Sequence, residues 1–350
     1  MITVKVNASK SYDIHIGEGL LQQAGGMIAG ACGGSKALIV ADSITGALFG
    51  DEAEYSLRAA GYETARFTFP HGERSKNTDT LLALLHAMAE ANLTRTDAAV
   101  SLGGGVAGDI AGFAAAIYLR GIRLAHIPTT LLAMVDSSVG GKTAVDLASG
   151  KNQIGAFYQP DAVICDTRTL RTLPGDVYAD GCAEMIKHGI ILSRELFGLL
   201  KLPLDAQMDD IIARNVTIKR DVVEKDEKDT GIRMLLNFGH TIGHGIEKYS
   251  GYAVSHGKAV AAGIASAARG AYKSGVCAES CYAEIVDMLN LYGLPDRTDI
   301  PADLLIEASL YDKKRGGGII KEILPEEIGK CVIKDFTLEE YAGFIRLAIE

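Results

Sequence analysis

Residues 98–109 read AAVSLGGGVAGD, and this stretch decides the fold. An apolar run of five residues leads into glycines at 103, 105 and 108, which form a G-x-G-x-x-G pattern and open a helix. A continuous apolar run predicts a strand buried on both faces. Glycines without β-carbons let backbone N–H groups approach a pyrophosphate at a helix N-terminus. The acidic residue expected about 20 positions later is absent. The pattern alone therefore fits dinucleotide binding and a tight structural turn equally well.

Similar apolar runs lie on both sides of this stretch. Residues 37–41, 124–127 and 162–165 are short and apolar, and each is followed by Asp or Pro. An amphipathic helix between two of these runs completes a βαβ pattern, which predicts a mostly parallel sheet. Asp42 ends the first run, where it could bind a ribose hydroxyl or be an ordinary residue at the end of a strand.

The pattern changes near residue 176. Helical periodicity then covers residues 177–200, 205–224, 232–249, 256–275, 278–292 and 302–311, with strand-like runs only at 319–324 and 331–333. A chain of 350 residues predicts about two domains. We expect a Rossmann-like α/β domain over residues 1–175 and a mainly helical domain over 176–350, with the active site in the cleft between them.

Composition excludes several classes of protein. The 35 basic and 44 acidic residues give a net charge of −9, which argues against a nucleic-acid partner. The longest apolar run, residues 110–119, is too short to cross a membrane. The N-terminus lacks the pattern of a signal peptide, and the six cysteines form no C-x-x-C pair. We expect a cytoplasmic protein with reduced thiols.

Three histidines near glycines indicate a metal site. Residues 237–244 read NFGHTIGH, which places His240 and His244 one helical turn apart, and His256 opens the next predicted helix. Imidazoles that converge with a carboxylate such as Glu184 are typical zinc ligands. His188 could compete as a ligand. The alternative is that each histidine only forms hydrogen bonds within a helical core.

Lysines beside glycines indicate an anionic substrate. Lys142 lies in VDSSVGGKT (135–143) and Lys151 in GKNQIG (150–155), and a third basic cluster covers residues 312–316. A P-loop is excluded because Asp136 stands where its first glycine belongs. These lysines predict a phosphorylated or carboxylated substrate, unless they are solvated surface residues.

Together, in order along the chain, these motifs resemble the 3-dehydroquinate synthase family of the sugar phosphate cyclase superfamily. Each motif is weak alone, but their order is specific. The resemblance is carried by residues 70–76, 103–109, 127–132, 134–146, 150–155, 184–187, 236–244, 256 and 312–314.

The resemblance implies a lyase of the shikimate pathway. It would convert 3-deoxy-D-arabino-heptulosonate 7-phosphate to 3-dehydroquinate by transient oxidation with NAD, phosphate elimination, re-reduction and aldol closure. It implies one zinc or cobalt ion as well as NAD. Arg120 would reach the phosphate site of a neighbouring subunit, which implies a homodimer.

Site roles also follow from the resemblance. It assigns the metal to Glu184, His240 and His256, and makes His244 a residue of substrate binding and proton transfer, in contrast to the simple H-x-x-x-H pair. The implied catalytic residues are Asp136, Lys142, Lys187, Lys219 and His244. The implied substrate contacts are Arg120, Asp136, Lys142, Asn152, Lys187, Lys219, Arg233, Asn237, His244 and Lys314 rather than Lys313. The implied NAD contacts are Asp42, His71, Gly72, Glu73, Arg74, Ser75, Lys76, Gly104, Gly105, Val106, Ala107, Gly108, Asp109, Thr129, Thr130, Lys142, Lys151, Thr169, Leu170, Arg171 and Thr172. His71 departs from the family, which often has Asp there.

Three alternatives remain at this point. A metal-dependent polyol dehydrogenase of the glycerol dehydrogenase type would share the architecture but accumulate NADH. A related cyclase would act on a sugar phosphate without a carboxylate. A binding module without activity is disfavoured because every expected ligand and cation is present.

Overall fold

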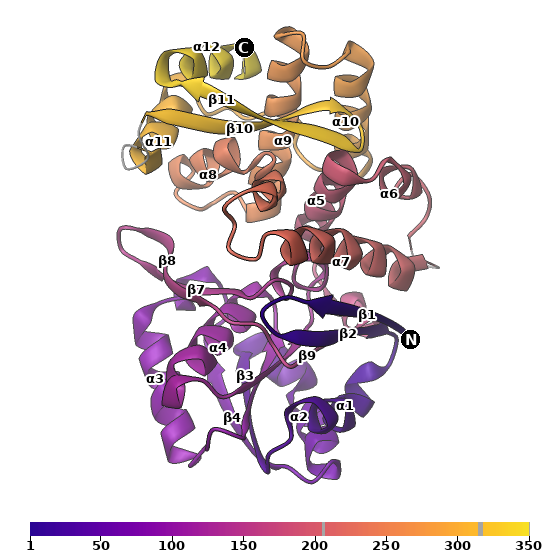
Figure 1. The fold of residues 1–350 in the computed structure, drawn as a ribbon, viewed down its shortest axis with the longest axis vertical. Helices are drawn as coiled ribbons and strands as arrows, with labels where there is room; N and C mark the ends of the chain where they lie inside the picture. Colours follow the sequence, from indigo (N-terminus) through magenta and orange to yellow (C-terminus); the bar gives the residue numbers. More distant parts are fainter. Residues whose placement is uncertain (205–206, 314–317, 350) are drawn as a thin grey trace. The chain divides into compact units, whose positions relative to one another are not determined.

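The computed structural model divides into two compact units (Figure 1). It describes residues 1–204, 207–309 and 318–349 in full, and residues 310–313 by their backbone. The first unit is Met1–Pro174 with Gln207–Lys228, and the second is Gly175–Ala206 with Asp229–Glu350. Residues 207–228 differ from the expectation, because their helix α7 (Met208–Lys225) packs on β1 (Ile2–Asn7) of the first unit.

Within its described residues, the first unit contains a seven-stranded sheet of order β1-β2-β9-β6-β5-β3-β4. β1 pairs antiparallel with β2, and all other pairings are parallel. The remaining strands are β2 (Ser11–Gly17), β3 (Lys36–Asp42), β4 (Glu63–Phe69), β5 (Ala98–Gly103), β6 (Arg123–Pro128) and β9 (Ala162–Asp166). The four apolar runs of the sequence are β3, β5, β6 and β9, which confirms the mostly parallel sheet.

Helices cover both faces of this sheet (Figure 1). Alternate residues of β3 point to opposite faces, as strand geometry requires. Ala37, Ile39 and Ala41 belong to one core, together with α1 (Ala24–Cys32) and α2 (Ser43–Ala59). Leu38 and Val40 belong to the other, with α3 (Thr78–Glu90) and α4 (Gly105–Ile117). A hairpin of β7 (Lys142–Leu147) and β8 (Gly150–Phe157) packs against α4.

The strand order reverses between β3 and β5. In the sheet, β4 lies next to β3 on one side of this point, and β6 lies next to β5 on the other side. In open α/β sheets, ligands bind outside the carboxyl ends of the strands at such a point. The carboxyl ends here are Asp42 and Gly103.

The second unit is mainly helical, as expected. Its central helix is α9 (His256–Lys273), which packs against α5 (Gly175–Leu192), α8 (His240–Tyr249), α10 (Glu279–Leu291) and α12 (Leu338–Ile349). The other elements are α6 (Arg194–Leu199), η7 (Ile232–Asn237), α11 (Ala302–Lys313) and the antiparallel hairpin β10 (Ile319–Glu327) with β11 (Lys330–Thr337). Within the described parts of both units, no helix has the length and apolar character that a membrane crossing requires.

Candidate active site

The glycine-rich turn lies between β5 and α4. A β-carbon on Gly103 would lie 2.8 Å from the Ala107 β-carbon, and one on Gly105 would lie 3.1 Å from the Ser137 hydroxyl. Gly104 is the N-cap of α4. Side chains at these positions would therefore crowd this turn. Because glycine has no β-carbon, the turn can be tight and the backbone N–H groups at the start of α4 stay accessible to a ligand. The Asp42 Oδ2 atom lies beside it, 3.4 Å from the same Gly103 position.

Asp42 also has a local structural role. Its Oδ1 accepts hydrogen bonds from the backbone N–H groups of Ile44 and Thr45, at 2.8 and 3.0 Å, and so caps α2. The position of Asp42 is therefore compatible with both roles that the sequence leaves open, an ordinary residue at the end of a strand and a ligand contact, and the structure adds its role as a helix cap.

A cluster of charged residues around buried Lys76 lies at the start of α4. The Lys76 ammonium group is 2.5 Å from Asp109 Oδ2 and donates to Asn152 Oδ1 at 2.6 Å. Burial alone would lower the pKa of Lys76, but the carboxylates of Asp109 and Glu73 outweigh it and raise that pKa. Lys151 forms a 3.8 Å ion pair with Glu73. Three separate segments of the implied NAD site thus meet here.

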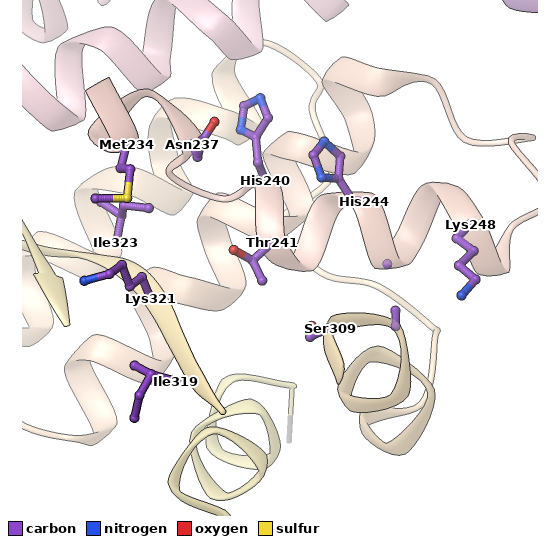
Figure 2. A pocket seen from close by; sticks show the side chains of 12 residues that line it. Met234, Asn237, His240, Thr241, His244, Lys248, Ser309, Ile319, Lys321 and Ile323 are labelled. Atoms are coloured by element: carbon purple, nitrogen blue, oxygen red, sulfur yellow. The ribbon is translucent and has the colours of Figure 1, made fainter. Parts of the chain in front are cut away.

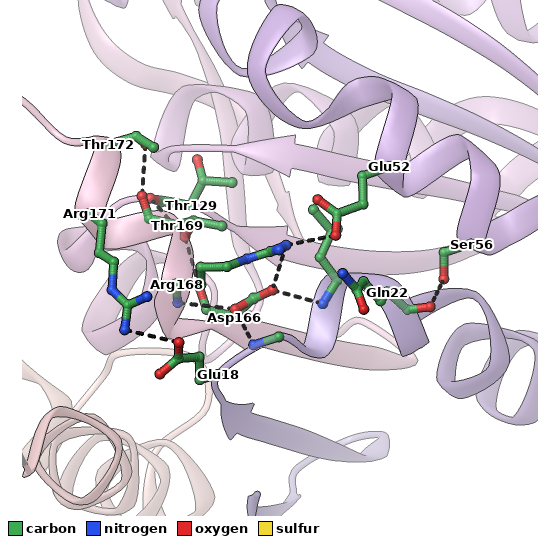
Figure 3. Close-up of polar contacts among 12 residues, drawn as sticks. Glu18, Gln22, Glu52, Ser56, Thr129, Asp166, Arg168, Thr169, Arg171 and Thr172 are labelled. Atoms are coloured by element: carbon green, nitrogen blue, oxygen red, sulfur yellow. Dashed lines mark hydrogen bonds and ion pairs between the residues drawn. The ribbon is translucent and has the colours of Figure 1, made fainter.

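Further contacts hold segments of the implied NAD site at the same edge of the sheet. The His71 N–H donates to Ser43 Oγ at 3.2 Å, which ties residues 70–76 to the start of α2. The Thr169 hydroxyl, on η5 (Thr167–Thr172), donates to the Thr129 carbonyl at 3.4 Å. Figure 3 shows this turn, held by Asp166, and also shows Arg171 paired with Glu18 at 2.9 Å.

Asp136 and Lys219 pair within the first unit. The short π-helical segment Ala133–Ser137 carries Asp136, and α7 supplies Lys219. The ammonium group lies 2.7 Å from Asp136 Oδ1 and donates to its carbonyl oxygen at 2.5 Å. Lys219 is only 6% exposed, so the partner carboxylate offsets the cost of burying its charge. Lys142, the first residue of β7, is exposed.

The second unit brings Glu184, His240 and His256 together. One possible ligand atom from each lies within 4.8 Å of the others. Glu184 Oε1 is 3.7 Å from His240 Nε2 and 3.8 Å from His256 Nε2. Glu184 is fully buried, and its Oε1 receives no hydrogen bond within the described residues, while Oε2 pairs with Lys187. Two imidazoles and an unsatisfied buried carboxylate oxygen fit a divalent metal ion with an open position.

Glycines allow the helices of this group to approach closely. Gly239, at φ 77°, is the N-cap of α8, and a β-carbon on Gly263 of α9 would lie 2.0 Å from the Gly239 carbonyl oxygen. A β-carbon on Gly257 would lie 2.3 Å from the Asp180 Cα of α5. Beside it, the Ser255 hydroxyl donates to the Asp180 carboxylate at 2.6 Å. His240 and His256, each the first residue of its helix, meet because of these contacts.

The two histidines differ in electrostatics. Burial, and then the positive charge of Lys187, lower the pKa of His240 well below its usual value, so its imidazole is neutral. Burial alone would lower the pKa of His256, but the Glu247 and Glu184 carboxylates outweigh it and raise that pKa. His244 lies beside them, with ring centres 5.6 Å from His240 and 6.4 Å from His256. His188 is fully buried on α5.

A cavity of about 500 Å³ opens beside these histidines (Figure 2). Asn237, His240 and His244, all named from the sequence, line it. Thr241, Lys248, Ser309 and Lys321 also line it and were not anticipated. The cavity offers cationic and hydroxyl groups next to the group of Glu184, His240 and His256.

The other predicted substrate residues are spread over both units. Arg233 is 2% exposed in η7 of the second unit, whereas Lys219 belongs to the first. Arg120 is exposed in the first unit. Lys314 lies outside the described residues, and Lys313 is described by its backbone alone.

Sequence reasoning missed three carboxylates, two of which contact predicted site residues and one of which contacts Ser255, the neighbour of His256. Asp146 Oδ1 accepts the Asn152 N–H at 2.7 Å, Asp180 pairs with Ser255, and Glu247 contacts His256. For Glu247 a signal was present, because it follows His240 by seven residues and therefore shares its helix face.

Comparison with known proteins decides the family. Residues 66–180 match the family profile described as 3-dehydroquinate synthase N-terminal, and residues 181–315 match 3-dehydroquinate synthase C-terminal. The chain belongs to the 3-dehydroquinate synthase family. The 3-dehydroquinate synthase of Enterococcus faecalis is 42% identical over 342 residues, 96% of each chain. That of Lactococcus lactis is 41% identical over 345 residues, 96% of this chain and 97% of its own.

Solved structures agree with this family. A 2-deoxy-scyllo-inosose synthase complexed with carbaglucose-6-phosphate, NAD⁺ and Co²⁺ superimposes with a TM-score of 0.88 at 27% identity, over 99% of both chains. The 2-epi-5-epi-valiolone synthase of Streptomyces hygroscopicus, with NAD⁺ and Zn²⁺ bound, gives a TM-score of 0.87 at 26% identity, over 99% of this chain and 98% of its own. A 1,3-propanediol oxidoreductase, at 17% identity and a TM-score of 0.70 over 99% of both chains, shares the fold.

Proposed function

We propose that this chain carries out the family reaction with NAD at the β3–β5 switch point and one zinc or cobalt ion held by Glu184, His240 and His256. As a member of its family, the protein is a lyase that converts 3-deoxy-D-arabino-heptulosonate 7-phosphate to 3-dehydroquinate and phosphate. The observation that carries the site proposal is the unsatisfied Oε1 of buried Glu184, which faces the Nε2 atoms of both histidines.

The proposed NAD site rests on the narrow glycine turn. Backbone N–H groups at the start of α4 would bind the pyrophosphate, because no β-carbon stands in the way at Gly104 and Gly105. Asp42, beside the turn, would bind a ribose hydroxyl with the oxygen that does not cap α2. Lys76 and Asp109 would hold the hairpin residue Asn152 next to the cofactor. Solved relatives with NAD⁺ bound support this assignment.

When bound, NAD would accept and return one hydride, and the metal ion would polarise the oxygen at the carbon being oxidised. The chain's own residues would bind the substrate and move protons. His244, one turn after His240 and on the cavity wall, would transfer the proton of the reacting hydroxyl. Lys187, buried against Glu184, would donate to a substrate hydroxyl beside the metal site.

Cations would bind the two anionic ends of the substrate. We assign the phosphate to Lys142, Asn152 and Lys314, with Arg120 from the neighbouring subunit, and the carboxylate to Lys219 and Arg233. Asp136 would position Lys219 through their 2.7 Å ion pair, and Asn237, on the cavity wall, would donate to the substrate. Arginine binds a carboxylate with two parallel hydrogen bonds, which lysine cannot do.

We also propose a cytoplasmic homodimer. All six cysteines are free thiols, as a reducing compartment favours. Arg120 projects from a turn in which Leu119 and Arg120 both have positive φ, 49° and 65°. Such a backbone is unfavourable for residues other than glycine, and its cost is compatible with a functional role for the exposed arginine.

The proposal is tested by following two products at once. Purified protein with the heptulosonate phosphate, NAD and zinc should release inorganic phosphate without a net rise in absorbance at the NADH band. A chelator should abolish phosphate release, and added zinc or cobalt should restore it. Glycerol with NAD is the control reaction. Stoichiometric accumulation of NADH from glycerol would instead favour the polyol dehydrogenase alternative.

A further inference from the structure

Each of the two histidines in the proposed metal site has a second ring nitrogen that faces an acceptor. His240 Nδ1 lies 3.2 Å from the Phe238 carbonyl oxygen. His256 Nδ1 lies 3.5 Å from Glu247 Oε1. A carbonyl and an ionised carboxylate can only accept hydrogen bonds. Both acceptors therefore select the tautomer with the proton on Nδ1.

This choice of tautomer leaves both Nε2 lone pairs available. The two Nε2 atoms are those that face Glu184 Oε1, at 3.7 and 3.8 Å. If either proton moved to Nε2, that ring would present an N–H group where a ligand atom is needed. The acceptors at Nδ1 consequently decide whether the group can bind a metal ion.

The two acceptors differ in kind. The Phe238 carbonyl belongs to the backbone and is present whatever side chain stands there. Glu247 is a side chain, 3% exposed, and its own backbone is fixed because its carbonyl accepts hydrogen bonds from Tyr252 N–H at 2.8 Å and Ser250 Oγ at 3.0 Å. The acceptor at His256 Nδ1 is thus a side chain that a substitution can remove.

We propose that Glu247 is the positioning residue of His256, which fixes its ring orientation and its Nδ1–H tautomer for metal binding. The inference rests on the proposed metal site and adds a residue to it. The negative charge of Glu247 also makes the His256 ring a more basic ligand. Outer carboxylates of this kind commonly change metal affinity by about 10- to 100-fold.

The test measures zinc affinity rather than turnover. Zinc dissociation constants of the full-length protein would be determined by competition with a chromophoric chelator. Glu247→Ala should weaken zinc binding by about 10- to 100-fold. Glu247→Gln, which keeps an accepting oxygen but loses the charge, should weaken it less. Glu322→Gln is the matched control, because Glu322 is also a buried carboxylate of the second unit but accepts a hydrogen bond from Tyr341. The Glu322→Gln protein should bind zinc with wild-type affinity.

A second readout reports the tautomer directly. In zinc-free protein with ¹⁵N-labelled histidine, at alkaline pH, the His256 ring should show the Nδ1–H pattern in wild type and a mixture of tautomers in Glu247→Ala. The signals are assigned by their loss in His256→Ala. Wild-type zinc affinity in both Glu247 variants, or an Nε2–H ring in wild type, overturns the inference. If His256→Ala also keeps wild-type zinc affinity, the proposed metal site itself is wrong.

Discussion

His126 is a buried histidine whose charge state links stability to pH. It is 5% exposed, pairs with Ser101 on the adjacent strand, and its Nδ1 lies 2.7 Å from the Ser101 hydroxyl. Burial lowers the pKa of His126 to about 4, so it is neutral in the folded protein. The unfolded chain takes up the proton near pH 6.5. The stability that the neutral ring supports is therefore complete above pH 6.5 and is lost as the pH falls to about 4.

We expect the free energy of unfolding to fall by up to about 3 kcal/mol from this group over that range. Denaturant titrations between pH 7 and pH 4 would measure it, with His126→Gln as the comparison because glutamine does not titrate. The variant should show a shallower pH dependence. An identical pH dependence in both proteins would mean that the ring titrates normally.

Replacement of Arg233 tests whether the substrate carries a carboxylate, because we assign the binding of that carboxylate to Arg233 and Lys219. Replacing Arg233 by alanine should remove a charge-assisted contact of about 1.5–3 kcal/mol, a loss of roughly 10- to 150-fold in kcat/KM for the heptulosonate phosphate. Arg233→Lys should recover part of the loss. Arg269→Ala is a matched control, because Arg269 contacts Tyr282 and the Ile349 carbonyl and none of the residues assigned to the substrate. Wild-type kinetics in Arg233→Ala would contradict the assignment, and thermal unfolding would reveal a folding defect.

The sequence predicts those site residues whose chemistry restricts the residue type, and it does not predict those whose contacts depend on how helices pack. Glycine-flanked histidines and a helical Glu184 were visible as possible ligands, because chemistry restricts the residue types. Helical spacing alone favoured His240 with His244, yet spacing within one helix does not show which neighbouring helix supplies the third ligand. Asp180 escaped because its role depends on packing between helices, and a single carboxylate carries no pattern. Glu247 shares the helix face of His240, but that spacing does not show that it contacts His256 of the next helix.

Close helix packing gives a prediction at the scale of elements. Gly263 of α9 faces the Gly239 carbonyl oxygen, and an added β-carbon would stand 2.0 Å from it. Gly263→Ala should force α8 and α9 apart, lower the free energy of unfolding by about 1–3 kcal/mol or more, and weaken zinc binding by separating His240 from His256. Unfolding curves and chelator competition would measure both effects.

The matched control is Gly343→Ala in α12. No atom lies within 4 Å of the β-carbon that this change adds, and the position is exposed. Alanine should stabilise that helix by about 0.5–1 kcal/mol because it loses less backbone entropy than glycine. Equal effects at positions 263 and 343 would show that α8 and α9 tolerate the added carbon.

The sequence predicted helices and strands best where a single hydrophobic pattern continued over the whole element. The apolar runs of β3, β5, β6 and β9 follow directly from burial on both faces. β4 and the β7–β8 hairpin were missed because their residues alternate between buried and exposed environments without a long apolar run. The helical pattern of α7 was recognised, but its unit was not, because periodicity indicates a buried face without indicating which neighbour buries it.

At the scale of the whole molecule, the position of Arg120 predicts how subunits cooperate. Its turn is held from both sides: Arg95 Nε donates to the Leu119 carbonyl at 3.1 Å, and the Tyr158 hydroxyl donates to the Ile122 carbonyl at 2.5 Å. The arginine itself is exposed. If it completes the phosphate site of a neighbouring subunit, Arg120→Ala and Lys142→Ala should each be inactive alone.

Mixing the two inactive proteins should then restore activity. In a hybrid of Arg120→Ala and Lys142→Ala subunits, one of the two sites combines the intact Lys142 of one subunit with the intact Arg120 of the other. Random exchange makes half of the dimers hybrids, so the mixture should reach roughly a quarter of the wild-type activity. Phosphate release measures the recovery, and native mass spectrometry of differently tagged subunits verifies the exchange. No recovery after verified exchange would place Arg120 in the site of its own subunit, because the hybrid would then contain one defective residue in every site. Full activity of Arg120→Ala alone would place Arg120 outside any site.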